Sequence, residues 1–442
     1  MQTQPAMPRV MEDKGAVSRR PTLWLSIAAG TLILLAIVTT VVWMGPLPSK
    51  VVVMSTGTAG GTYDIFAQRY KAILARSGVV LRLVPSGGGV ENLTRLNDPH
   101  SGVTVAFVQS GLTSEEQSPD LESLGTLFYE PFWLFSRNAN LGTLLEGLHG
   151  KKVSVGPEGS GTRVVALQFL AAIGIDQNNA QLLPLTAAQS GDALLRGEID
   201  AAVMVASWDT PVVRRLLDST DVHVLEFPDV DAFLALHPFL SKLVLPAGTA
   251  NMIINRPPTD IAMVAPKASL IVRRDLHPAI QYLLLGAADE IHAAPGIFQK
   301  AGQFPAHEEE DLPLSKEATR YFKSGDPFLQ RYLPFWLAVI TGRTLVLLIP
   351  IIGIAYPLLR TTPALYAWSM RRRIFRLYGE LQSIEIEFAT KGNRAADEIL
   401  ARLNRLEERA DRLHLPQAFA TLLYTLRDHI GMVRNRLKES GR

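Results

Sequence analysis

Two long apolar runs stand out in the pattern of hydrophobic and polar positions along the chain. The first covers Leu23 to Met44 and the second covers residues 333–360. Each is long enough to cross a bilayer, which takes about 20 apolar residues in a helix. Arg20 precedes the first run and Arg371–Arg373 follow the second, and such basic residues are typical of the cytoplasmic side. The sequence therefore predicts two transmembrane segments, with the N-terminal tail 1–22 and the C-terminal end both in the cytoplasm.

The first run is interpreted as an uncleaved anchor. A secretory signal peptide has a shorter apolar region of about 7–15 residues and a small-x-small cleavage site, and "WMGPLPSK" offers no such site. Residues 46–330 are then expected on the periplasmic face of a bacterial inner membrane. Arg343 lies within the second run, where a charge is costly. It either sits at headgroup depth or pairs with another membrane subunit.

Between the two runs, residues 46–330 alternate short apolar stretches with helical patterns. This alternation is the signature of an α/β fold. The stretches "LVLPAGTAN" and "DIAMVAPKASLIVRR" are predicted to be strands that return from a second lobe. We therefore expect two α/β lobes joined by crossing strands, with a cleft between them, as in a hinged binding protein.

Three strand–loop–helix units in this domain have loops rich in glycine, serine and threonine. The loops are Ser55–Tyr63, Ser86–Gly89 and Gly156–Thr162. Free N–H groups in a first helical turn attract anions, and ligands of open α/β sheets bind at the carboxyl ends of the strands. One loop alone is equally well a tight turn without a ligand. Three such loops in one domain favour a site that surrounds a small anionic group.

Polar side chains near the loops add to the predicted site. Thr62 is the expected N-cap after the first loop, and either Ser160 or Thr162 is the expected N-cap after the third. Two further strands, "VTVAFVQSG" and "IDAAVMVAS", end close to Gln109 and Trp208. We expect these two side chains at the same edge of the cleft.

The composition and the motifs argue against several other classes of protein. Gly61 is followed by Thr62 and not by lysine, so the first loop is not a Walker A loop, and its glycines lack the dinucleotide-binding spacing. The chain has no cysteine, its nine histidines show no metal-ligand spacing, and its net charge of +2 is unlike that of a dedicated nucleic-acid binder. Ser160 lacks the spacing of a nucleophile elbow. No cofactor, bound metal or enzymatic activity is therefore expected.

Residues 363–442 have three stripes of apolar residues at heptad-like steps. The stripes begin at Ile374, Ile399 and Phe419, and Pro416 is expected to open the last helix. This pattern predicts a cytoplasmic bundle of three amphipathic helices. The bundle is either simply self-packed, or it serves as a docking or dimerisation surface, or it relays ligand occupancy across the membrane.

An ordered set of motifs between roughly Val51 and Pro305 resembles a known family. "STGTAGGTYDIFAQRY", "PSGGGVENLTRL", "VAFVQ", "GPEGSGTR" and "GEIDAAVMV" are similar, in that order, to the TAXI-type solute receptors of tripartite (TRAP) transporters. The apolar run and tail resemble the membrane-anchored subgroup. The resemblance implies a two-lobed, type II periplasmic-binding-protein-like domain for a small carboxylate, glutamate-like or a 2-oxoacid. It places donors of the three loops at Thr62 and Tyr63, at Ser86–Gly88 with Asn92, and at Ser160–Thr162.

One stretch departs from the family pattern. "VASWDTPVVRRLL" stands in place of an expected small-residue stretch, so Trp208 is expected to reshape the pocket. Glu91, at a helix start, either caps that helix or contacts the ligand. The predicted ligand-binding residues are Ser55, Thr56, Gly57, Thr62, Tyr63, Ser86, Gly87, Gly88, Glu91, Asn92, Gln109, Ser160, Gly161, Thr162 and Trp208.

Two functions follow from these patterns. The first is a membrane-anchored receptor that captures a small carboxylate or amino acid and passes it to a multi-span permease. The alternative is a membrane protein that senses the ligand and signals to the cytoplasm through its C-terminal bundle, which would also be the surface for any homo-oligomer. The sequence does not separate the two.

Overall fold

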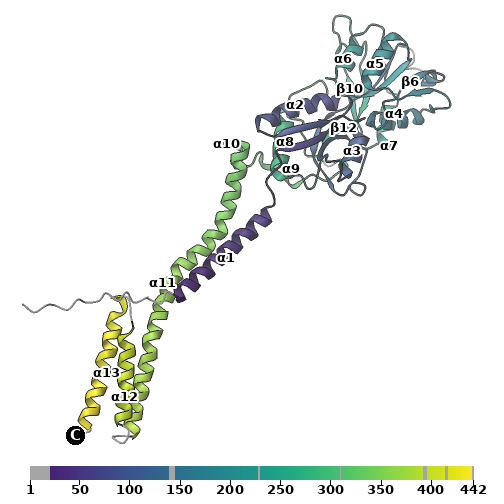
Figure 1. The fold of residues 1–442 in the computed structure, drawn as a ribbon. Coiled ribbons are helices and arrows are strands. Elements are labelled where there is room, and N and C mark those ends of the chain that lie inside the picture. Colours follow the sequence, from purple (N-terminus) through teal and green to yellow (C-terminus); the bar gives the residue numbers. More distant parts are fainter. Residues whose placement is uncertain are drawn as a thin grey trace, which may run out of the picture. The chain divides into compact units, whose positions relative to one another are not determined.

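The computed structural model describes residues 20–138, 145–226, 229–308, 310–391, 396–413 and 417–440 (Figure 1). The chain divides into two compact units. One is the mixed α/β unit Pro46–Gly342. The other is helical and contains the chain up to Gly45 and from Arg343 onward.

The first lobe of the α/β unit is built on a five-stranded sheet. Its strand order is β2-β1-β3-β12-β4, where β12 runs antiparallel to both of its neighbours and the other strands are parallel to one another. The sheet is buried against helices on its faces, and Tyr70, Phe107 and Leu284 lie in its core. The elements are β1 (Val51–Ser55), α2 (Thr62–Arg76), β2 (Val80–Val84), α3 (Gly89–Asn97), β3 (Val105–Gln109), β4 (Leu121–Tyr129), β12 (Lys267–Arg273), α8 (Pro278–His292), α9 (Lys316–Ser324) and α10 (Phe328–Tyr332).

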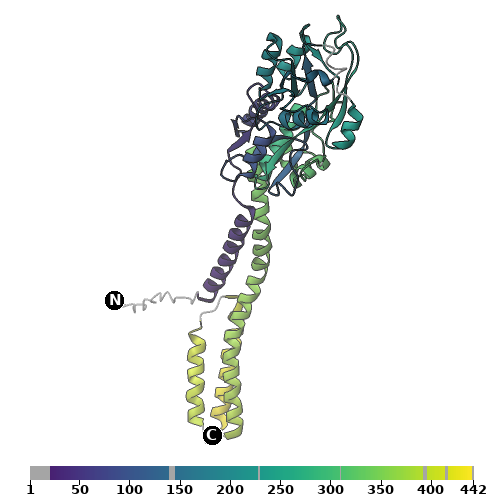
Figure 2. The same cartoon turned by 90° about the vertical axis from the view of Figure 1, so that its right-hand side faces the viewer.

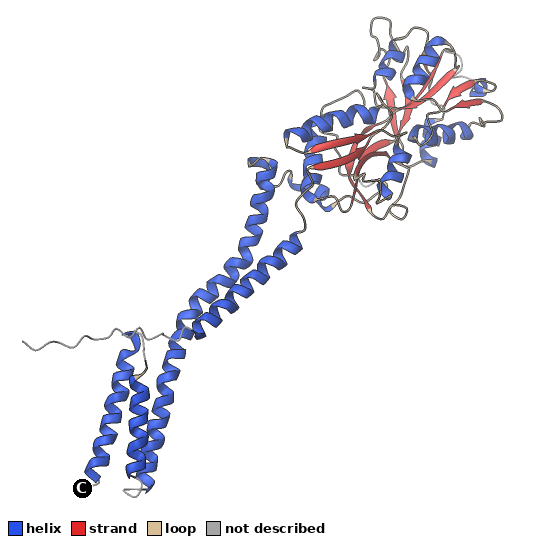
Figure 3. Cartoon of the chain, viewed as in Figure 1, coloured by secondary structure: helices blue, strands red, loops and turns tan. Residues whose placement is uncertain are grey.

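The second lobe repeats this arrangement with different strands. Its sheet has the order β7-β6-β8-β5-β9, and here β5 is the antiparallel insert. Figure 3 shows the strands of the α/β unit in red and the helices around them in blue. A separate antiparallel pair, β10 with β11, packs against the second lobe. The elements are β5 (Phe132–Ser136), η2 (Leu145–Leu148), β6 (Lys152–Ser154), α4 (Gly161–Ala172), β7 (Gln181–Leu183), α5 (Ala187–Arg196), β8 (Ala201–Val205), α6 (Pro211–Asp218), β9 (His223–Val224), α7 (Val230–Leu236), β10 (Ser241–Leu245) and β11 (Ile261–Ala265).

The chain passes between the lobes twice, from β4 to β5 and from β11 to β12. The two crossings lie side by side, because the Glu130 backbone N–H donates to the Pro266 carbonyl over 2.9 Å. The predicted two-lobed, type II binding-protein fold is confirmed by the two matching sheets. The prediction for "LVLPAGTAN" is wrong in one respect. Leu243–Leu245 belong to β10, which pairs with β11, so β12 alone returns to the first lobe.

The helical unit contains α1 (Arg20–Met44), most of α11 (Phe335–Lys391), α12 (Ala396–Asp411), η4 (Gln417–Phe419) and α13 (Ala420–Ser440). The three apolar stripes of the tail meet in one core. The C-terminal part of α11 lies beside α12 and α13 (Figure 2). Leu422 departs from its stripe: it is 37% exposed, and Leu423 packs on the core instead. The predicted helix start at Pro416 lies outside the described residues.

The long helix α11 is the one described helix that is long and apolar enough to cross a membrane, over Phe335–Thr390, by length and composition. It runs without a break through Pro350, Pro357 and Pro363, so no boundary separates the predicted segment 333–360 from the bundle. Within α1, the apolar stretch found by the same criteria is shorter, Gly30–Met44.

Arg343 lies where α11 runs beside the C-terminal end of α1. Its guanidinium donates to the carbonyls of Gly45, at 3.1 Å, and Met44, at 3.4 Å. The last carbonyls of a helix have no partners within the helix, and a basic side chain there also interacts favourably with the helix dipole. Arg343 therefore caps α1, which neither sequence-based interpretation had foreseen.

Candidate ligand pocket between the two lobes

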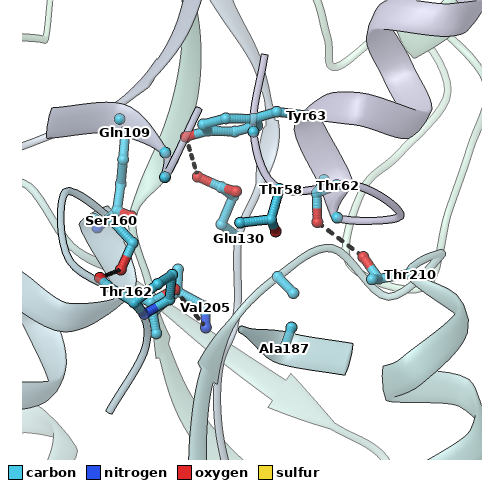
Figure 4. A pocket seen from close by; sticks show the side chains of 18 residues that line it. Thr58, Thr62, Tyr63, Gln109, Glu130, Ser160, Thr162, Ala187, Val205 and Thr210 are labelled. Atoms are coloured by element: carbon cyan, nitrogen blue, oxygen red, sulfur yellow. Dashed lines mark hydrogen bonds between the residues drawn. The ribbon is translucent and has the colours of Figure 1, made fainter. Parts of the chain in front are cut away.

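A pocket of about 80 Å³ lies between the lobes, and all three glycine-rich loops line it (Figure 4). Its walls come from both sheets and from the first crossing of the chain. The lining residues are Gly57, Thr58, Gly61, Thr62, Tyr63, Gly87, Gly88, Gly89, Gln109, Glu130, Pro157, Ser160, Gly161, Thr162, Ala187, Val205, Ala206 and Thr210. The convergence of loops that are far apart in the sequence makes this the candidate site.

Helices α2, α3 and α4 begin at the three loops that line the pocket, and α5 begins at a further lining residue, Ala187. Helix α2 starts at Thr62 with Gly61 as its N-cap, and α3 starts at Gly89 with Gly88 as its N-cap, and no side chain caps either of them. The prediction that Thr62 is the N-cap is therefore wrong by one residue. Helix α4 differs, because the Ser160 hydroxyl accepts from the Arg163 N–H at 3.1 Å. First-turn N–H groups and the positive end of each helix dipole favour an anion at this position.

The second and third loops approach each other so closely that only glycine fits. A Cβ at Gly87 would stand 2.5 Å from the carbonyl oxygen of Glu158, and one at Gly88 would stand 3.1 Å from the Cα of Ser160. Gly88 also has φ of 136°, which L side chains rarely adopt. The Glu91 N–H donates to the Gly159 carbonyl at 3.1 Å across the same gap. The glycines thus let one lobe touch the other beside the pocket.

Several predicted side chains turn away from the pocket and hold the loops in place. The Asn92 amide donates to the carbonyls of Thr56, at 2.7 Å, and Phe107, at 2.9 Å, and its oxygen accepts from the hydroxyls of Ser55 and Ser86, each at 2.7 Å. This network is buried, and Ser55, Thr56, Ser86 and Asn92 do not line the pocket. Their position behind the loops supports the backbone that faces the pocket.

Glu91 serves its own helix and loop. Its carboxylate accepts from the Gly87 N–H at 2.6 Å and pairs with Arg95 one turn later. The Gly87 N–H precedes the N-cap Gly88, so this bond holds the loop and does not cap the helix. Glu91 is also not among the lining residues, and its contact with a ligand stays a prediction.

Thr62 links the lobes at the floor of the pocket. Its hydroxyl shares a hydrogen bond of 2.8 Å with that of Thr210 and accepts from the Ser207 N–H at 3.2 Å. Thr162 has a comparable position in the second lobe, where its hydroxyl accepts from the Val205 N–H at 3.4 Å. Both threonines line the pocket, and their predicted contact with a ligand stays a prediction.

Gln109 reaches the pocket from the end of β3. The side chain is 3% exposed, and its Nε2 has no hydrogen-bond partner in the described part of the chain. A buried amide N–H without a partner costs free energy, which a ligand oxygen would recover. A Cβ at Gly161 would lie 2.4 Å from Oε1 of this amide, so Gly161 leaves room for it.

Glu130 is an ionisable lining residue that the sequence-based prediction missed, and Thr58 and Thr210 are further polar lining residues that it missed. It lies at the first crossing between the lobes, is 3% exposed, and its Oε2 accepts from the Tyr63 hydroxyl at 2.9 Å. Burial raises the pKa of this carboxyl to about 8, and the hydrogen bond from Tyr63 lowers it in part. Burial and the neighbouring Glu130 likewise raise the pKa of Tyr63. A lone acid in "FYEPF", between two apolar strands, was the available signal.

Trp208 lies outside this pocket. It lines a second cavity of about 180 Å³, together with Phe66, His292 and Phe298. Its ring is 6.1 Å from that of Trp133, and the Arg214 guanidinium lies 4.6 Å from its centroid. The lining residues nearest to it in sequence are Ala206 and Thr210.

No group of three or more histidine, aspartate and glutamate side chains that could hold a metal ion occurs among the residues the structure describes. The donors of the pocket are backbone N–H groups, hydroxyls and one amide, which are suited to an oxyanion. The arrangement can bind and orient a small oxygen-rich molecule.

Comparisons with known proteins found one matching family and several distant solved structures. The model of the NMT1-like family matches residues 54–324. A solved structure from Bordetella bronchiseptica RB50 is 17% identical, with a TM-score of 0.40, and the alignment covers 64% of this chain and 92% of that chain. The periplasmic aliphatic sulphonate binding protein SsuA from Escherichia coli is 15% identical, with a TM-score of 0.34 and coverage of 71% and 83%. An ancestral arginine-binding protein bound to arginine is 14% identical, with a TM-score of 0.36 and coverage of 55% and 93%. Likenesses this distant do not identify the ligand of this chain.

Proposed function

Because this chain belongs to the NMT1-like family, we propose that its α/β unit is a solute-binding domain that holds a small organic anion between its two lobes. The observation that carries this proposal is the pocket itself. Three helix starts from two lobes converge on it, and the unpartnered amide of Gln109 lines it. Backbone N–H groups at helix starts are a common protein solution for binding an anion.

The ligand class that fits this chemistry is a small carboxylate. No lysine, arginine or histidine lines the pocket in the described ranges, so the charge of the anion would be balanced by helix dipoles and hydrogen bonds. The ordered motifs that resemble TAXI-type receptors support a place in a TRAP-type transport system, with a multi-span permease as the partner. The basic residues that flank the apolar runs support a periplasmic binding domain and cytoplasmic chain ends.

A ligand sensor is the second candidate, and one observation favours it. Helix α11 begins with Phe335, which packs in the core of the first lobe, and the same helix continues to Leu381, which packs in the core of the bundle. Because α11 contributes residues to both cores, ligand occupancy in the α/β unit has a covalent connection to the bundle. Reporter fusions at Ser241 and Leu437 test the shared premise of both candidates. We expect Ser241 outside and Leu437 inside, and a cytoplasmic Ser241 would contradict both.

The binding proposal is tested on the purified full chain in detergent. Thermal-shift screening of small carboxylates and amino acids, followed by calorimetry, should find a ligand that raises the melting temperature. The variant Gln109→Leu should weaken binding of that ligand about ten- to a hundredfold, because a hydrogen bond to a charged group contributes about 1.5–3 kcal/mol.

Gln281→Leu is the matched control. Gln281 is also a buried glutamine of the first lobe, with an unpartnered side-chain oxygen, but it lies in α8 and does not line the pocket. We expect its variant to bind like the parent. Equal affinities of the parent and both variants would place the site elsewhere.

A further inference from the structure

Glu130 is the one acidic residue that lines the pocket among the described residues, and no basic side chain of that part of the chain lines it. This is unexpected in a site that attracts anions, since an ionised Glu130 would repel them. The charge state of this carboxyl therefore decides what the pocket accepts.

The surroundings of Glu130 do not stabilise an ionised carboxylate. It is 3% exposed, and among the described residues Tyr63 supplies its one side-chain hydrogen bond. A buried carboxylate needs a cation or several donors to offset the loss of hydration. Charged side chains on neighbouring elements already have partners of their own. The ion pairs are Lys267 with Glu308 and Glu310, Glu91 with Arg95, and Glu158 with Arg163. The Asp64 carboxylate accepts from the Gly60 backbone N–H.

The pKa of Glu130 agrees with this geometry. Burial raises it to about 8, so the carboxyl is mainly protonated at pH 7. Because Tyr63 donates to Oε2, the proton belongs on Oε1, and a protonated carboxyl has one O–H to donate.

We propose that Glu130 binds the ligand as a neutral carboxylic acid, whose O–H donates a hydrogen bond to an anionic oxygen of the ligand. The site then selects organic anions without an ammonium group, such as 2-oxo acids, over the corresponding amino acids. This inference rests on the proposed function. The other polar groups of the pocket also favour an anion, since the N–H groups of the helix starts and the Gln109 amide are donors. An ammonium group has only donors and would find no negative partner there.

The test compares matched pairs of probes on the full chain in detergent: pyruvate with L-alanine, and 2-oxoglutarate with L-glutamate. Each pair differs in the group at C2. Calorimetry at pH values from 6 to 9 should show at least one 2-oxo acid binding about tenfold or more tightly than its amino acid. Its affinity should fall about tenfold per pH unit above the pKa of Glu130, because each binding event then requires the uptake of one proton.

The variant Glu130→Gln keeps a neutral side chain that can accept from Tyr63 and donate to the ligand. We expect it to bind the 2-oxo acid several-fold more weakly than the parent, with an affinity that no longer depends on pH. Infrared difference spectra between pH 7 and pH 10 give a readout without any ligand. The carbonyl band of a protonated, buried carboxyl should be present in the parent at pH 7 and missing in the variant.

Three outcomes would overturn the inference. If an amino acid binds more tightly than its 2-oxo acid and Glu130→Gln abolishes that binding, an ionised Glu130 meets an ammonium group, and the proposed function still stands. Absence of the protonated carboxyl band would refute the neutral state directly. If no small carboxylate binds at all, the proposed function fails and this inference fails with it.

Discussion

The two lobes share a strand order but present different chemistry to the pocket. The first lobe contributes two helix starts without side-chain caps and the unpartnered Gln109 amide. The second lobe contributes helix starts that Ser160 and Thr186 already cap, the apolar side chains of Val205 and Ala206, and the hydroxyls of Thr162 and Thr210. Both of these hydroxyls already bond to the protein. The same fold thus supplies uncapped helix starts on one side, and on the other side polar groups that are mostly engaged within the protein. We infer that the first lobe provides most of the binding free energy.

The largest effect should come from the glycine contact between the lobes. Gly87→Ala would push a methyl group to within 2.5 Å of the Glu158 carbonyl oxygen, a backbone atom that cannot move alone. Such overpacking costs about 1–3 kcal/mol, so calorimetry should show ligand affinity falling by up to about a hundredfold. Gly286→Ala is the control, since its methyl would lie 4.0 Å from the nearest side chain. Unchanged affinity in Gly87→Ala would mean that ligand binding does not require the close contact between Gly87 and the Glu158 carbonyl.

A matched pair of threonines compares the lobes directly. Thr62→Val removes the hydroxyl that bonds to Thr210 and accepts from Ser207, and leaves both of those groups unpaired. We expect about a tenfold loss of affinity, because an unpaired buried polar group costs about 1–3 kcal/mol. Thr162→Val removes one long hydrogen bond within the second lobe and should change affinity much less. Equal losses of ligand affinity in the two variants would contradict the inference that the first lobe provides most of the binding free energy.

Tyr63→Phe should act through Glu130. The Tyr63 hydroxyl donates to Glu130, and this bond lowers the pKa of that carboxyl. Without it the pKa should rise further, and the pH at which binding of a 2-oxo acid declines should move upward, while affinity at pH 6 changes by only a few-fold. The pH profile of the variant, measured beside that of the parent, provides the check. If ligand affinity depends on pH in the same way in the variant and the parent, the Tyr63 hydroxyl does not affect the pKa of Glu130.

Glu130 should also make the stability of the fold depend on pH. Its folded pKa of about 8 is raised above the ordinary value of 4.5, so its contribution to stability is fully present below about pH 4.5 and is lost as the pH rises to about 8. The slope from one such group is about 1.4 kcal/mol per pH unit. Glu130→Gln should reduce this loss of stability with rising pH. The melting temperature of the variant minus that of the parent should therefore be larger at pH 8 than at pH 5. An identical dependence in both proteins would show that Glu130 is not buried as described.

The smallest effect is expected at Ser160. Its hydroxyl caps α4, and loss of an N-cap typically costs about 1 kcal/mol. Ser160→Ala should therefore lower the melting temperature slightly, and it should free an N–H group without removing a donor to the ligand. Affinity should stay within a few-fold of the parent. A large loss of affinity would indicate that Ser160 contacts the ligand directly. The second lobe would then contribute a larger share of the binding free energy than we infer.

The sequence predicted the backbone part of the site better than its side chains. Glycine-rich turns between strands and helices have a local signature, so the loops around Gly57, Gly87 and Gly161 were identified and do line the pocket. Gln109 was also identified, because its place at the end of a buried strand follows from the alternation of elements. These features depend on short stretches of chain.

The parts that escaped prediction depend on contacts distant in sequence. Asn92 has the same local position as a ligand donor, but its partners Thr56 and Phe107 come from other strands and turn it inward. Glu130 becomes a pocket residue only because the chain crosses between the lobes there. Trp208 faces another cavity, because the turn before α6 brings Thr210 to the pocket instead.

The most direct test of the account is a structure of the chain with its tightest-binding carboxylate. We predict that one carboxylate group lies between the starts of α2, α3 and α4, within hydrogen-bond distance of their first-turn N–H groups and of the Gln109 Nε2. Glu130 Oε1 should lie within hydrogen-bond distance of a ligand oxygen. A carboxylate bound in the cavity beside Trp208, or at any place without contact to these helix starts, would contradict the account.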